Sequence, residues 1–179
     1  MKVTKLALLV PALTVSLMAN AATDSVNVNI SGTVVANSCT ITEKAAGASV
    51  SFGRVSVGDF STTPGFAAAT KDFSIHLTDC GADTSSVTIS ASGTPDLTLP
   101  EAFINEATTG AATNVGVTIF GGADRTTQLK PSGDNNVTYD LDAKNENELP
   151  FTAKLVQDSA KTPGTGELTS VVTLKLLYN

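Results

Sequence analysis

The sequence predicts an all-β protein, built as an antiparallel sandwich of short strands. Three observations indicate this fold class. Apolar residues recur with a period of two, turns rich in Gly and Pro separate the apolar runs, and helical periodicity is weak throughout the 179 residues. A chain of this length can bury a substantial core. Because we find neither a repeat nor a linker, we expect one folded domain.

Residues 1–21 are predicted to be a secretory signal peptide rather than part of the fold. Two lysines precede an apolar run over 6–18, and residues 19–21 place small side chains where a signal peptidase reads. A membrane anchor is the alternative, but an apolar run of about 13 residues is shorter than the roughly 20 that a bilayer span needs. We expect cleavage after Ala21, which leaves 22–179 as the mature chain.

The first predicted strand lies in an N-terminal extension, residues 22–36. Apolar and small polar residues alternate there, which gives the strand one face that can be buried. Only Asn37 and Ser38 separate it from the first cysteine, so it is either an ordinary edge strand or an arm outside a disulfide-closed body. Its apolar face carries Val26, Val28, Ile30, Gly32 and Val34.

Two cysteines, Cys39 and Cys80, are the only thiols of this predicted export protein. An even number of cysteines in an oxidising compartment favours one intramolecular disulfide. Closing this loop would contribute about 4 kcal/mol by restricting the unfolded chain. A redox pair or two free thiols are the alternatives, but no C-x-x-C spacing is present, and the sequence does not place His76 where it could activate either sulfur.

Further strands are predicted along the rest of the chain. Turn signals such as Gly-Thr-Pro at 93–95 and Pro-Ser-Gly-Asp at 131–134 separate the apolar runs, and only residues 100–107 could form a helical turn or two. Seven or so short strands without alternating helices are typical of a sandwich of immunoglobulin-like size. The β-rich runs cover 49–52, 71–77, 86–91, 115–120, 136–141, 151–157 and 167–178.

The last predicted strand is long and apolar on one face, and the sequence ends one residue after it. Such a strand is normally followed by a partner that covers its edge. Gly166 precedes it within a Gly-Thr-Gly turn, which shows no phosphate-loop pattern because no Lys follows. The alternating face carries Leu168, Ser170, Val172, Leu174, Leu176 and Tyr178.

Composition and charge argue against two classes of ligand. The chain has 11 Lys and Arg against 17 Asp and Glu, a formal charge of -6, and an acidic chain without a basic run repels nucleic acid. Trp is absent and aromatic residues make up 5% of the chain, which leaves few rings for stacking on sugars. We therefore expect no nucleic-acid partner and disfavour a secreted sugar-binding sandwich.

No catalytic residue, metal site or cofactor is predicted. One histidine and two cysteines cannot form a four-ligand zinc site without carboxylates. His76 is expected to face solvent or a neighbouring strand, and no Ser-His-Asp set can be argued around it. The protein is therefore not expected to be an enzyme. One acidic stretch lacks the EF-hand spacing and is interpreted as a solvated strand end and loop: Asp140, Asp142, Glu146 and Glu148.

Taken in order, these motifs resemble the pilins of bacterial chaperone–usher fimbriae, close to the type 1 major-subunit group. Each motif is short, but together they span the mature chain. They are the Val-x-Val-x-Ile-x-Gly-x-Val segment, Asn-Ser-Cys-Thr-Ile at 37–41, Leu-Thr-Asp-Cys at 77–80, the strands at 114–119 and 149–153, Gly166 fourteenth from the end, and the penultimate Tyr178.

The resemblance implies an incomplete immunoglobulin-like sandwich that lacks its last strand, with residues 37–179 as the pilin domain. Residues 22–36 would be a donor strand that enters the groove of a neighbouring subunit, a known form of β-augmentation. Implied partners are neighbouring pilin subunits, a periplasmic chaperone and an outer-membrane usher, in a surface fibre involved in cell adhesion. The acceptor groove and chaperone-binding strand would include Gly166, Leu168, Val172, Leu174, Leu176 and Tyr178.

Two other functions stay open from the sequence. A minor adaptor or a tip-associated subunit of the same fibre would share these motifs. Tip adhesins of this family usually carry an extra lectin domain in place of the donor arm, whereas this chain has the arm. A secreted sugar-binding sandwich is the more distant alternative. The host receptor is not identifiable from the sequence.

Overall fold

The computed structural model describes residues 31, 38–43 and 47–179. The chain divides into two units, Met1–Val34 and Val35–Asn179, and the sandwich lies in the second. The predicted signal peptide and the predicted donor residues Val26, Val28, Ile30, Gly32 and Val34 lie outside the described residues. Within the described part, no helix is long and apolar enough to cross a membrane.

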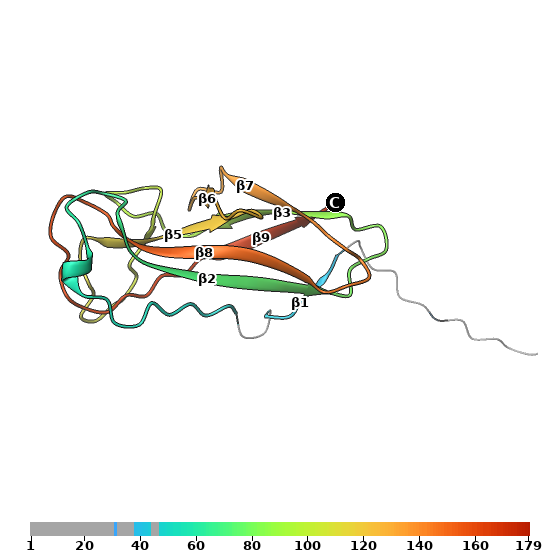
Figure 1. Ribbon diagram of the computed structural model, residues 1–179, viewed down its shortest axis with the longest axis horizontal. Helices are drawn as coiled ribbons and strands as arrows, with labels where there is room; N and C mark the ends of the chain where they lie inside the picture. Colours follow the sequence, from blue (N-terminus) through green and yellow to red (C-terminus); the bar gives the residue numbers. More distant parts are fainter. Residues whose placement is uncertain (1–30, 32–37, 44–46) are drawn as a thin grey trace, which may run out of the picture. The chain divides into compact units, whose positions relative to one another are not determined.

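The described residues form an all-β fold, as predicted, with one short 3-10 helix. The strands make two antiparallel sheets, ordered β1-β2-β8-β5-β4 with β6 beside β5, and β7-β3-β9 (Figure 1). The elements are β1 (Thr40–Ile41), η1 (Val57–Asp59), β2 (Ala67–Thr78), β3 (Ser86–Ser92), β4 (Phe103–Ile104), β5 (Val115–Gly121), β6 (Thr127–Leu129), β7 (Asn136–Asp140), β8 (Asn147–Gln157) and β9 (Thr173–Tyr178).

The core lies between the two sheets and follows from strand alternation. In β3, Val87, Ile89 and Ala91 are buried, whereas the Ser and Thr residues between them are half-exposed. Phe151 of β8 stacks on Phe73 of β2, its direct partner in the sheet, with ring centroids 5.4 Å apart. Phe151 also contacts Tyr139 of β7 in the other sheet, and the buried apolar side chains of both sheets form one core.

The disulfide predicted between Cys39 and Cys80 is present. It joins the residue before β1 to the loop that follows β2, and both cysteines pack against the core. Because no cysteine among the described residues is free, the structure does not agree with the alternative of two free thiols.

Two of the predicted elements are wrong. Residues 49–52 form no strand, although Val50 and Phe52 pack against the core as an alternating strand would. Residues 100–107 form a turn and the short strand β4 rather than a helical segment. The reason is local, because the Asp96 carboxylate accepts hydrogen bonds from the N–H groups of Thr98 and Leu99 and shapes a turn.

The predicted strand 167–178 is only partly a strand. Regular pairing is restricted to β9, because its neighbour β3 ends at Ser92, opposite Thr173. The preceding residues instead bond to the segment between β4 and β5, through a parallel bridge from Ala111 to Glu167 and an antiparallel bridge from Thr113 to Gly164. The C-terminal segment thus changes partner halfway along its length.

Candidate functional site

A long groove of about 1300 Å³ opens the core of the sandwich to solvent. One rim is the extended segment 47–57, which runs alongside β2 (Figure 1), and the other rim is the segment 163–176, which includes most of β9. Apolar side chains of β2, β5 and β8 line the groove between these rims: Phe73, Ile75, Val115, Val117, Ile119, Ala153 and Leu155. Among the described residues, no element covers the core along this groove.

The C-terminal rim shows the alternation that the sequence predicts. Even-numbered residues from 168 to 178 are half-buried, and their odd-numbered neighbours are exposed. Five of the even-numbered side chains pack against the core: Leu168, Val172, Leu174, Leu176 and Tyr178. Gly166 and all of these except Tyr178 line the groove, so the structure brings the predicted C-terminal residues together along one rim.

The edge of β9 that faces away from β3 is unpaired within the described sheet. Asn179 and Ser86 exchange both backbone hydrogen bonds, at 2.9 and 3.3 Å, and this fixes the phase of the pairing. In an antiparallel pair, hydrogen-bonded residues alternate with residues whose N–H and C=O point away. Leu174 and Leu176 therefore direct their backbone groups toward the open edge and their side chains toward the core.

The opposite rim was missed as a functional element in the sequence. Val50, Phe52, Val55 and Val57 are half-buried, and Gly53, with φ of +69°, lies where the alternation shifts by one residue. Within the described residues, 48–55 make no main-chain hydrogen bond to a strand. The alternation of apolar residues in this segment was a usable signal, although a shift at a glycine interrupts its period. Both rims thus offer free backbone groups to an added strand.

Gly166 is required by a close approach of two backbones. A Cβ atom at this position would lie 2.5 Å from the carbonyl carbon of Ala111 and 2.5 Å from the nitrogen of Ala112. Contacts this short do not occur for real side chains, so only glycine lets the rim lie against the segment between β4 and β5. The turn that the sequence indicated therefore has a packing role at the groove.

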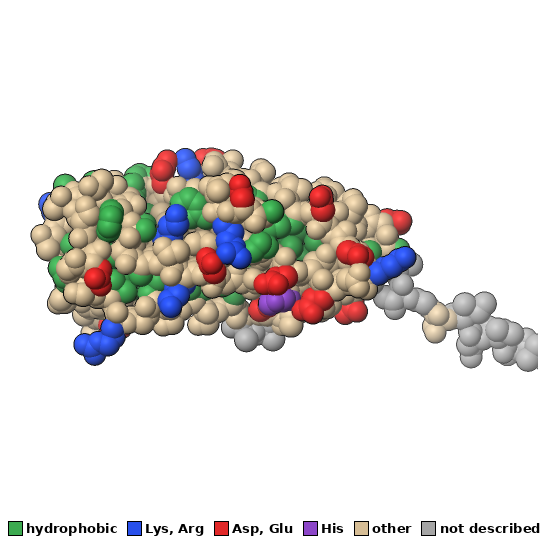
Figure 2. All heavy atoms as spheres, viewed as in Figure 1, with side chains coloured by type: hydrophobic (Ala, Val, Ile, Leu, Met, Phe, Trp, Pro, Cys, Tyr) green, Lys and Arg blue, Asp and Glu red, His purple; other side chains and the backbone are tan. Residues whose placement is uncertain are grey.

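An ion pair between Glu43 and His76 lies at the groove's edge. The Glu43 carboxylate is 2.6 Å from Nδ1 of His76 and also accepts from the backbone N–H of His76 at 3.1 Å. Figure 2 shows the histidine, in purple, beside red acidic side chains. The hydrogen bond to Glu43 raises the pKa of His76, as do the nearby Glu146 and Glu148 carboxylates. This contact ties the chain after β1 to β2.

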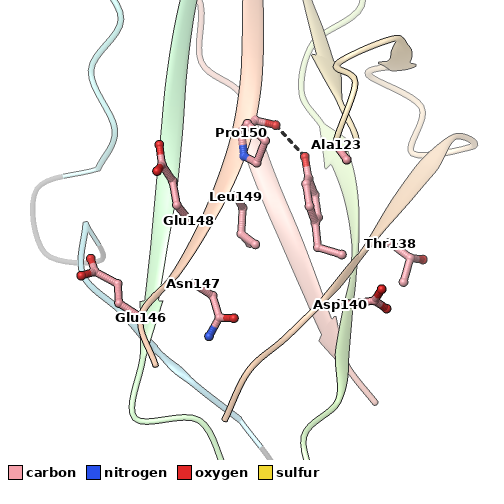
Figure 3. Close-up of a pocket in the computed structure, with 9 residues that line it drawn as sticks. Ala123, Thr138, Asp140, Glu146, Asn147, Glu148, Leu149 and Pro150 are labelled. Carbon is pink, nitrogen blue, oxygen red and sulfur yellow. Dashed lines mark hydrogen bonds between the residues drawn. The ribbon is translucent and has the colours of Figure 1, made fainter. Parts of the chain in front are cut away.

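A smaller cavity of about 540 Å³ lies between β7 and β8 (Figure 3). The buried hydroxyl of Tyr139 closes one part of it, donating to the Pro150 carbonyl at 2.7 Å and accepting from the Gly122 N–H at 2.8 Å. Acidic side chains of Asp140 and Glu146 line it as well. The described residues contain no group of three His, Cys, Asp or Glu side chains that could hold a metal ion.

Comparison with protein families relates the chain to known proteins. Residues 28–179 match the family model described as Fimbrial protein. The laminin-binding fimbrial subunit ElfA of Escherichia coli O157:H7 is 32% identical over 134 residues, which cover 69% of this chain and 74% of ElfA. The uncharacterized fimbrial-like protein YcbV of Escherichia coli K12 is 38% identical over 93 residues, and the chain spans about half, 53%, of its length.

Two solved structures of pilus subunits have a similar fold. The P pilus rod subunit PapA matches with a TM-score of 0.61 and 20% identity, over 79% of this chain and 99% of PapA. A subunit of a chaperone–usher pilus matches with a TM-score of 0.61 and 23% identity, over 94% of this chain and 100% of that one. At these identities the likeness establishes the fold, an immunoglobulin-like sandwich of the pilus-subunit type.

Proposed function

We propose that this chain, which belongs to the fimbrial protein family, is a structural subunit of a chaperone–usher fimbria and polymerises by donor-strand exchange. The observation that carries the proposal is the open groove, where an apolar core and the free edge of β9 face solvent together. An exposed edge and an exposed core are both costly on their own. A strand laid into the groove removes both at once.

In this proposal the C-terminal rim is the acceptor. An incoming strand would pair with the open edge of β9 and lay alternate side chains on the floor of the groove. A periplasmic chaperone would occupy the same rim before assembly. The residues proposed to form this acceptor and chaperone-binding strand are Gly166, Leu168, Val172, Leu174, Leu176 and Tyr178.

The donor is proposed to be residues 22–36 of the next subunit. Val26, Val28, Ile30 and Val34 would be buried in the groove, and Gly32 would sit where the acceptor core approaches closely. Burying four aliphatic side chains at roughly 1.5 to 3 kcal/mol each contributes about 6 to 12 kcal/mol before ordering costs. Ladder hydrogen bonds add to this. A strand of this kind completes the fold of its neighbour.

The route to the surface follows from the same proposal. Residues 1–21 would be removed on export, and the pilin domain, residues 37–179, would fold in the periplasm, where its disulfide can form. An outer-membrane usher would then add the subunit to a fimbrium on the cell surface, where the fibre takes part in adhesion. We further propose that the subunit has no catalytic activity, as befits a structural fimbrial family.

A head-to-tail contact of this type does not close on itself, so its product is a filament. Releasing a donor strand would expose a core and a sheet edge in one step. Because that transition is costly, we expect the contact between subunits to be kinetically stable, with a lifetime set by a slow dissociation rate.

Deletion of residues 22–35 tests the proposal. In cells with the cognate assembly machinery, the shortened subunit is expected to be exported and to bind chaperone, but to form no fibres. A milder variant, Ile30→Asp, is expected to act in the same direction because it puts a charge into an apolar groove. Normal fibres from the deletion variant would overturn the donor assignment. Subunit counting in purified fibres separates the main shaft protein from a minor adaptor.

A further inference from the structure

The side chain of Asn105, in the segment after β4, forms four hydrogen bonds to main-chain groups. Its Nδ2 group donates to the carbonyl oxygens of Glu167 at 2.8 Å and Ala112 at 2.9 Å. Its Oδ1 atom accepts from the N–H groups of Thr169 at 3.0 Å and Ala107 at 3.1 Å. Both donors of the amide are used, and its oxygen accepts twice.

Two of these bonds lie on either side of Leu168 on the C-terminal rim. Asn105 donates to the carbonyl before Leu168 and accepts from the N–H after it. A residue in a parallel β-ladder bonds its neighbouring strand in the same way, one donor and one acceptor on either side of the residue that it faces. The side-chain amide therefore replaces one peptide group of an absent strand.

This replacement occurs in the segment before β9, which does not pair with β3. Pairing with β3 ends at Thr173, and the rim before it bonds to the segment between β4 and β5 instead. Main-chain bonds there include Glu106 N–H to the Thr169 carbonyl at 2.6 Å and Glu167 N–H to the Gly110 carbonyl at 2.7 Å. The backbone N–H and C=O groups of odd-numbered residues thus point toward the body of the protein on both halves of the rim, although their side chains are exposed.

The consequence is a continuous phase along the rim. The backbone groups of residues 167 and 169 bond to Asn105 and its segment, and those of residues 173, 175 and 177 bond to β3. The backbone groups of even-numbered residues therefore point toward the open edge along both halves of the rim. Their side chains are half-buried from 168 to 178. The open edge therefore continues beyond the six residues of β9.

We propose that Asn105 is a positioning residue of the acceptor groove, which extends the open edge of β9 to Leu168 and keeps it in register for an incoming strand. The inference rests on the proposed donor-strand exchange. Asn105 does not line the groove, but in this proposal it determines how many residues of the donor strand the groove can hold. Removal of the amide would shorten the usable edge without opening the rest of the sandwich.

The test uses fibres assembled from the full chain by its cognate machinery, and it measures the rate at which denaturant releases subunits. Asn105→Ala removes all four bonds, whereas Asn105→Asp keeps the oxygen that accepts two of them and loses the Nδ2 group that donates the other two. Asn147→Ala is the matched control, because the Asn147 amide also bonds three loop backbone groups, those of Asp142 and Asn145, away from the groove. Leu168→Ala, alone and with Asn105→Ala, completes a double-mutant cycle.

We expect subunits to leave Asn105→Ala fibres about ten times faster, which corresponds to the loss of the two bonds that flank Leu168. Asn105→Asp should also speed release. In a chain that already carries Leu168→Ala, Asn105→Ala should change the logarithm of the release rate by less than about half as much, because Asn105 acts by positioning Leu168. If a variant assembles no fibres, the periplasmic level of its disulfide-bonded subunit decides. A normal level supports the inference, whereas a level reduced as much as the fibres overturns it.

Equal release from the Asn105 and Asn147 variants, or additive effects with Leu168→Ala, would show a general structural role and overturn the inference. Failure of the proposed function looks different. In that case the unsubstituted chain forms no fibres, or fibres form equally well after deletion of residues 22–35. The two failures are therefore distinguished in one set of strains.

Discussion

The substitution Gly166→Ala puts one methyl group where two backbones touch. The new Cβ would lie 2.5 Å from backbone atoms of Ala111 and Ala112, whereas ordinary contacts of this kind are at 3.4 Å or more. The rim must therefore move away by about 1 Å, since neither neighbour is a flexible side chain. Two main-chain bonds span this contact, Glu167 N–H to Gly110 at 2.7 Å and Ala112 N–H to Glu167 at 2.9 Å.

Weakening these two bonds at about 0.5 to 1.5 kcal/mol each gives a loss of about 1 to 3 kcal/mol. At about 1.4 kcal/mol for each factor of ten, subunits should leave Gly166→Ala fibres roughly 5 to 150 times faster than unsubstituted fibres. The assay follows released subunits by gel electrophoresis in a fixed concentration of guanidinium chloride. An added Cβ at Gly58 meets only the Ser56 hydroxyl at 3.6 Å, so Gly58→Ala is the control. Unchanged release from Gly166→Ala fibres would refute the close-packing argument.

Other consequences of the structure can be measured on the purified subunit or fibre. Reduction of the Cys39–Cys80 disulfide is expected to lower the free energy of unfolding by about 4 kcal/mol. Urea titrations with and without reductant measure this difference, and a change below about 1 kcal/mol would contradict the expected stabilisation. Tyr139→Phe leaves two half-buried backbone groups, the Gly122 N–H and the Pro150 carbonyl, without this partner and should cost about 1 to 3 kcal/mol by the same titration. An unchanged midpoint would argue against these two hydrogen bonds. The hydrogen bond to Glu43 raises the pKa of His76 above 6.5, so the stability that this contact contributes is lost as pH rises through the folded pKa of His76. The pKa of Glu43 is lowered from 4.5, so the same contribution is also lost as pH falls through the folded pKa of Glu43. His76→Gln should remove the upper limb of this thermal-stability profile, and a retained limb would assign it to another group.

The fold was predictable where a strand buries only one face, because apolar and polar residues then alternate. Val87, Ile89 and Ala91 show the pattern in β3, and the C-terminal rim shows it from Leu168 to Tyr178. In both places the period of two reflects one buried face, and a period survives any tertiary arrangement that buries that face.

Two of the errors share a physical origin, since strand pairing depends on neighbours that a local pattern does not contain. Val50 and Phe52 alternate like strand residues, but no described strand pairs with their backbone. Residues 167–172 also alternate, yet they bond to a loop because β3 ends at Ser92.

Part of the candidate site was likewise beyond sequence reasoning. Asn105 is one polar residue in a loop, and only the fold brings its amide to Leu168, which is 63 positions further along the chain. The ion pair between Glu43 and His76 also joins distant residues. The C-terminal rim could be proposed earlier because its residues are consecutive and its apolar period is unbroken.

A structure of the purified fibre by electron cryo-microscopy tests the central claim most directly. The account predicts that each groove contains residues 22–36 of the adjacent subunit, paired with the open edge of β9, with Val28 and Ile30 on its apolar floor. A groove that is empty in the fibre, or filled by residues 22–36 of the same chain, would contradict donor-strand exchange.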